Sequence, residues 1–71
     1  MKDLTKYVER VYKAHTVDEK RHIILEMIDA SHAKNTTKAK FRNQAQFISS
    51  SRKLDTLAGN YMLAGEGLSV L

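Results

Sequence analysis

Apolar residues recur at intervals of three and four along most of this chain, which is the spacing of one face of an α-helix. The first such group predicts a helix over residues 2–14 and consists of Leu4, Tyr7, Val8, Val11 and Tyr12. Thr16, followed three positions later by Glu19, has the pattern of a capping box, in which each side chain bonds a free backbone N–H of the first turn. A second helix is therefore predicted over residues 17–33.

The second helix has apolar residues on more than one side. Val17, Ile24 and Ile28 form its central stripe, whereas Ile23 faces nearly the opposite way. A helix that is apolar on several sides is usually covered on several sides. We therefore expect this helix to need more cover than the first helix provides, and we expect the protein to be a homo-oligomer.

A third, longer helix is predicted over residues 37–64, after a polar break at residues 35–37 whose side chains can cap it. One heptad-spaced stripe supports it: Phe47, Ser51, Leu54, Ala58, Tyr61 and Gly65. Phe41, Ala45 and Ile48 form a second, displaced stripe. The serines at 49–51 leave open whether the helix is continuous. Gly65 and Gly67 predict its end, which leaves residues 68–71 as an apolar tail.

These patterns predict an all-α fold with three helices in a single domain over residues 1–71. Proline is absent and only three glycines occur, so the residues that build β-hairpin turns are scarce. A domain of this length has a small core, and with no cysteine it has no disulfide, so self-association is the expected source of extra stability. The absence of cysteine, of a signal-peptide pattern at residues 1–6 and of a long apolar run predicts a cytoplasmic protein that does not enter membranes.

The strongest functional signal is the distribution of charge. The formal net charge is +4, and no acidic residue occurs between Asp29 and Asp55. The basic residues of that region form the predicted polyanion-binding site: Lys34, Lys38, Lys40, Arg42, Arg52 and Lys53. Lysine and arginine bind phosphates and release their counterions, so this pattern favours RNA. The alternative is a solvated helix face of a mildly basic protein.

Aromatic residues near the basic region add a second feature of RNA-binding proteins. Phe41, Phe47 or Tyr61 would stack on a base if exposed. At heptad spacing, however, aromatic residues usually fill a core, so this role depends on exposure.

Catalysis and metal binding have little support in the sequence. His22, Glu26, Asp29 and His32 share one side of the second helix. Bundle metal sites need matching ligands from neighbouring helices, and this chain has no second set unless another copy of it supplies one. No cysteine and no serine in a nucleophile motif occurs, and a chain this short rarely forms the dry pocket that acid–base catalysis needs. We therefore predict a non-enzyme without a metal or cofactor.

The sequence also resembles a known group of proteins. Residues 1–7 (MKDLTKY) and 52–61 (RKLDTLAGNY) are similar to small early accessory proteins of T4-type bacteriophages, and in particular to those described as modifiers of suppressor tRNAs. The resemblance implies a role in the maturation of phage tRNAs in the host cytoplasm. It implies no particular functional residues.

Three functions are therefore compatible with the sequence. The first is binding of RNA, such as tRNA or its precursor, through the basic helical face. The second is inhibition or redirection of a host enzyme by an amphipathic helix or by the tail at 68–71. The third is an oligomeric sponge for a phosphorylated nucleotide signal, with tyrosines such as Tyr7 or Tyr12 against the ligand.

Overall fold

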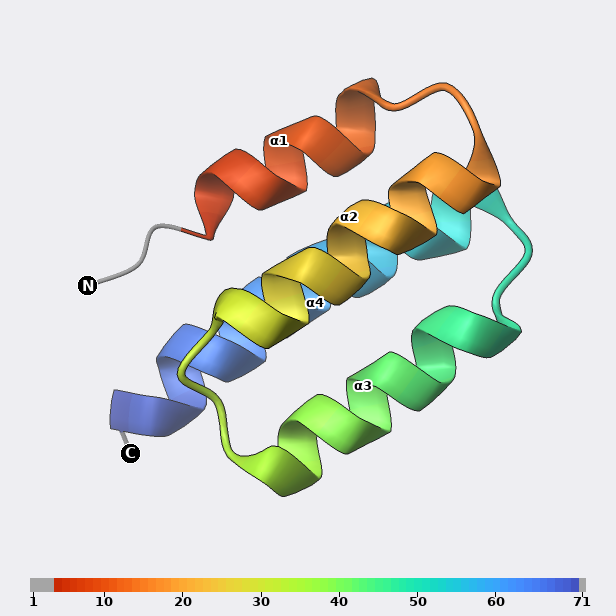
Figure 1. Ribbon diagram of the computed structural model, residues 1–71. Helices are drawn as coiled ribbons and strands as arrows, with labels where there is room; N and C mark the ends of the chain where they lie inside the picture. Colours follow the sequence, from red (N-terminus) through yellow and green to blue (C-terminus); the bar gives the residue numbers. More distant parts are fainter. Residues whose placement is uncertain (1–3, 71) are drawn as a thin grey trace.

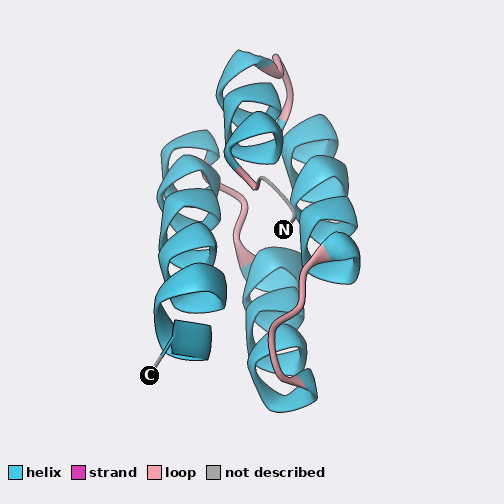
Figure 2. Ribbon diagram, turned by 90° about the vertical axis from the view of Figure 1, so that its left-hand side faces the viewer, coloured by secondary structure: helices cyan, strands magenta, loops and turns pink. Residues whose placement is uncertain are grey.

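The computed structural model describes the backbone of residues 4–70 and the side chains of residues 4–63. Over this part the chain forms four helices and no strand: α1 (Thr5–Lys13), α2 (Val17–Ala30), α3 (Asn35–Phe47) and α4 (Ser51–Val70). Helices α2 and α4 pack against each other, and α1 and α3 lie on opposite sides of this pair (Figures 1 and 2). The all-α prediction is confirmed, whereas the prediction of three helices is wrong.

The predicted third helix is two antiparallel helices joined by residues 48–50. Ile48 has an extended backbone (φ −84°, ψ 127°), which ends α3. The Ser50 carbonyl accepts the first helical bond of α4 from Leu54 N–H at 3.0 Å, and serine hydroxyls favour helix starts over helix interiors. The displaced stripe therefore lies on the inner side of α3, whereas Leu54, Ala58 and Tyr61 of the heptad stripe are buried on α4. Phe47, the first residue of the heptad stripe, belongs to α3 and is exposed.

The connection between α2 and α3 lies earlier than predicted. Helix α2 ends at Ala30 and not at residue 33, because Ser31 is extended and its hydroxyl donates to the Ile28 carbonyl at 2.8 Å. The same hydroxyl bonds the hydroxyl of Tyr61. Residues 35–37, which were expected to form the break, instead form the first turn of α3.

The predicted end of the last helix is also wrong, because α4 continues through Gly65 and Gly67 to Val70. No glycine in the described part of the chain has a positive φ, so neither glycine forms a left-handed cap. Glycine inside a helix costs only about 1 kcal/mol relative to alanine, which neighbouring turns can offset. The side chains of the proposed tail at 68–71 lie outside the described residues, as do residues 1–3 of the predicted first helix.

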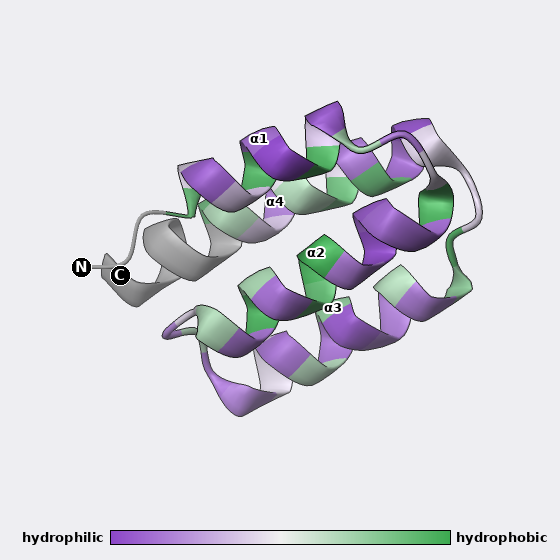
Figure 3. Cartoon of the chain, turned by 45° about the horizontal axis from the view of Figure 1, so that its top comes forward, coloured by the Kyte–Doolittle hydropathy of each residue, from purple (hydrophilic) through white to green (hydrophobic). Residues whose placement is uncertain are grey.

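The capping box and the core stripes follow the sequence closely. Thr16 Oγ1 accepts from the Glu19 N–H at 3.1 Å, although the Glu19 carboxylate accepts from His15 N–H and not from Thr16. The largest fully buried side chains are Val11, Ile24, Met27, Ile28, Leu54 and Tyr61. On α1 the hydrophobic residues face the other helices and the hydrophilic ones face outward (Figure 3).

Ile23 does not need a partner chain. Helix α2 contacts each of the other three helices, so its second apolar side is covered within one molecule and Ile23 is buried. The apolar residues on the second side of α2 therefore give no reason to expect an oligomer. None of the helices in the described part of the chain is both long and apolar enough to cross a membrane.

Candidate nucleic-acid interface

The six predicted polyanion-binding residues do not form one compact patch. Lys34, Lys38 and Arg42 are spaced by four residues and share one flank of α3, where Arg42 donates to Asp29 Oδ1 at 3.2 Å. Lys40 lies on the other, exposed side of α3. Since α3 spans about 20 Å at 1.5 Å per residue, Lys34 lies at the opposite end of α3 from the start of α4.

A smaller candidate surface consists of exposed residues of α3 and α4, two helices that pack against each other. Lys40 and Phe47 are two helical turns apart on one face of α3, and Arg52 and Lys53 are exposed at the start of α4, just after the short connection. We call this surface the α3–α4 outer face and define it by its exposed residues: Lys40, Asn43, Phe47, Arg52, Lys53 and Asn60.

The charges of the outer face have no acidic partners among the described residues. The described ion pairs of Glu26, Asp18, Asp29 and Asp55 are formed with other cations: Arg10 (3.3 Å), Arg21 (2.9 Å), Arg42 (3.2 Å) and Lys20 (2.8 Å). No described acidic side chain pairs with Lys40, Arg52 or Lys53. The outer face therefore keeps its positive charge.

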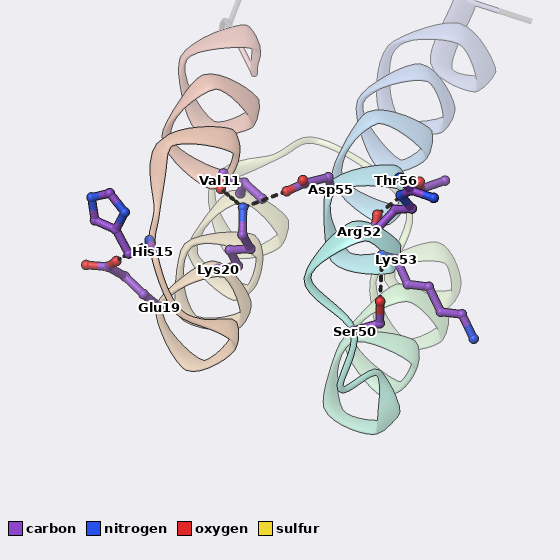
Figure 4. Close-up of polar contacts among 9 residues, drawn as sticks. All are labelled: Val11, His15, Glu19, Lys20, Ser50, Arg52, Lys53, Asp55 and Thr56. Carbon is purple, nitrogen blue, oxygen red and sulfur yellow. Dashed lines mark hydrogen bonds and ion pairs between the residues drawn. The ribbon is translucent and has the colours of Figure 1, made fainter.

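Lys20 explains why the one acidic residue of this region turns away from the outer face. Its ammonium is buried and donates to the Val11 carbonyl at 2.6 Å and to Asp55 Oδ1 at 2.8 Å (Figure 4). This contact joins α2 to α1 and α4 and fixes the Asp55 carboxylate on the inner side of α4. Arg52 and Lys53 lie away from it (Figure 4). The sequence indicated an inward position for Lys20, because this residue lies on the same stripe as Ile24 and Ile28.

Arg21 holds the end of α3 in place. Its guanidinium donates to the Ala45 carbonyl at 3.0 Å and to the Ile48 carbonyl at 2.8 Å, while its third nitrogen pairs with Asp18. The last carbonyls of a helix have no partner within the helix, so these bonds satisfy groups that would otherwise need water. Phe47 lies between the two anchored residues, and its backbone is therefore well fixed.

Of the three aromatic residues considered for base stacking, only one is exposed. The Phe41 ring packs edge-on against Tyr61, with centroids 5.0 Å apart and planes at 72°. Tyr61 is fully buried. Phe47, in contrast, is 78% exposed. The heptad stripe suggested a core position for Phe47, but the chain leaves α3 directly after it.

Several residues considered for metal binding or for a nucleotide site contact other side chains of the fold. Glu26 and Asp29 of the possible metal cluster pair with Arg10 and Arg42, and no group of three metal-binding side chains occurs among the described residues. Tyr7 lies under the guanidinium of Arg10, 5.7 Å from the ring centroid.

Comparisons of the chain with models of protein families, with curated proteins and with solved structures find no match.

Proposed function

We propose that this chain is a non-catalytic protein that binds RNA through the α3–α4 outer face. The observation that carries the proposal is the separation of charge: the cations of this face have no acidic partners among the described residues, while acidic side chains of α2 and α4 are paired with other cations. An RNA strand supplies the missing negative charge through its phosphates.

The neutral residues of the face suit the same ligand. Asn43 and Asn60 are exposed and offer both donors and acceptors to bases and sugar hydroxyls. A tRNA or its precursor, bound in the cytoplasm of a phage-infected host, is the specific partner that we propose from the resemblance to phage accessory proteins.

Binding is expected to weaken steeply with salt. If Lys40, Arg52 and Lys53 contact three phosphates of a single strand, log K should fall with log salt concentration with a slope of about −2. Affinity should then fall about 20-fold between 50 and 200 mM salt. Fluorescence anisotropy of a labelled tRNA and of an unstructured RNA measures this slope. Binding that is independent of salt, or no binding at 50 mM salt, would refute the proposal.

A second candidate is a protein-interaction module that blocks or redirects a host enzyme. Two further exposed apolar side chains favour it, namely Leu63 at 68% exposure and Tyr12 at 56% exposure. We also propose that the chain forms a homo-oligomer in which these two side chains contact another copy. Light scattering of the purified protein tests it: a monomer mass at micromolar concentration would exclude a stable oligomer.

A further inference from the structure

The exposed Phe47 has no explanation in the packing of the fold. Aromatic side chains bury large areas in cores and interfaces, yet this ring is 78% exposed at the end of α3, and the adjacent Ile48 is half-buried. A phenylalanine left in water at this position contributes little to the stability of the chain.

The surroundings of Phe47 limit what can cover it. Lys40 lies two turns earlier on the same face of α3, and Arg52 and Lys53 follow after the three-residue connection. No acidic residue occurs in the sequence between Asp29 and Asp55. An exposed ring with unpaired cations before and after it in the chain fits a partner that presents both negative charge and a flat apolar surface. An unpaired base on its phosphate backbone has both features.

The main chain that carries Phe47 is held rigidly. Arg21 bonds the carbonyls of Ala45 and Ile48, on either side of Phe47. The ring has only two side-chain torsions to fix on binding, so the loss of conformational entropy is small.

We propose that Phe47 is a stacking platform for an unpaired base, and that the preferred ligand is single-stranded RNA or a loop and not a duplex. This inference rests on the proposed RNA binding and adds the strandedness of the ligand. In a duplex the bases are stacked on each other and their faces are closed to Phe47. Phosphate contacts to Lys40, Arg52 and Lys53 would set the position of the strand, and the ring would capture one base.

The chain contains no tryptophan, so Phe47→Trp introduces a single fluorescent reporter at the stacking position. We expect its fluorescence to be quenched by a single-stranded RNA of about ten nucleotides. An abasic oligonucleotide with the same number of phosphates should bind more weakly and should not quench. Annealing the RNA to its complement should likewise remove the quenching.

The Phe47→Ala variant tests the energetic contribution of the ring. We expect its affinity for the single-stranded RNA to fall about tenfold or more, with its affinity for the abasic strand and its salt slope unchanged. Tyr12→Ala removes an exposed aromatic side chain of α1, outside the outer face, and should leave both affinities unchanged.

The two proposals fail in different ways. If the wild-type protein binds the RNA but Phe47→Ala binds it equally well, stacking is refuted while RNA binding stands. If the wild-type protein binds neither RNA nor the abasic strand at low salt, the proposed function fails and this inference fails with it.

Discussion

Replacing Tyr61 by alanine is expected to lower the free energy of unfolding by about 4 kcal/mol, the usual effect of deleting a buried aromatic side chain. Tyr61 is the largest of the fully buried side chains, and its ring packs edge-on against Phe41. A domain of this length has a total stability of about 4–10 kcal/mol. The variant should therefore retain no more than about 6 kcal/mol and unfold at a much lower urea concentration than the wild-type protein, which urea denaturation followed by circular dichroism measures.

Two control variants separate the contribution of the ring from that of its hydroxyl. Tyr61→Phe removes only the bond to the Ser31 hydroxyl, which keeps its bond to the Ile28 carbonyl, so the expected loss is about 1 kcal/mol. Tyr12→Ala removes an aromatic ring that is 56% exposed and should change stability by only about 0.5 kcal/mol. Equal losses for Tyr61→Ala and Tyr12→Ala would contradict the described core.

The Asp55→Ala substitution is expected to have the second largest effect. It leaves the buried Lys20 ammonium with the Val11 carbonyl but without a negative charge. Removing one partner of a buried pair typically costs 3–5 kcal/mol, and since the Asp55 side chain is 34% exposed we expect about 3 kcal/mol. Chemical denaturation gives the value directly.

A double-mutant cycle checks that this loss comes from the Lys20 contact. Lys20→Met keeps the length of the side chain and removes its charge, and we expect it to cost about 1–2 kcal/mol through the loss of its bonds to the Val11 carbonyl and to Asp55. In the Lys20→Met protein, Asp55→Ala should then cost less than about 1 kcal/mol. If Asp55→Ala has the same effect in both proteins, the pair does not stabilise the junction.

Local signals in the sequence predicted much of the helical structure. The N-cap bond of Thr16 and the stripe through Ile24 and Ile28 depend on residues three or four positions apart, and both were found, although the Glu19 carboxylate bonds His15 and not Thr16. The break at residues 48–50 was not predicted, because the spacing from Phe47 to Ser51 to Leu54 happens to keep the heptad period across it. The three serines were the local signal for the break.

The charge of the site was predictable, but its geometry was not. The gap in acidic residues between Asp29 and Asp55 identified the basic region. Which cations stay unpaired depends on contacts between distant parts of the chain: Lys20 meets Asp55 over 35 positions, Arg21 meets Ile48 over 27, and Arg42 meets Asp29 over 13. Likewise, the exposure of Phe47 and the burial of Tyr61 follow from the return of α4 along α3.

The most direct test of the proposed interface compares two charge reversals of equal size. The first double variant, Lys40→Glu with Lys53→Glu, changes the outer face. The second, Lys6→Glu with Lys13→Glu, changes two exposed lysines of α1. Each pair lowers the net charge by four, from +4 to zero. We predict that the first pair reduces RNA affinity by about 100-fold at 50 mM salt. The second pair should reduce it by no more than about threefold, through its long-range effect alone. Equal losses for the two pairs, or a larger loss for the α1 pair, would contradict an RNA site on α3 and α4.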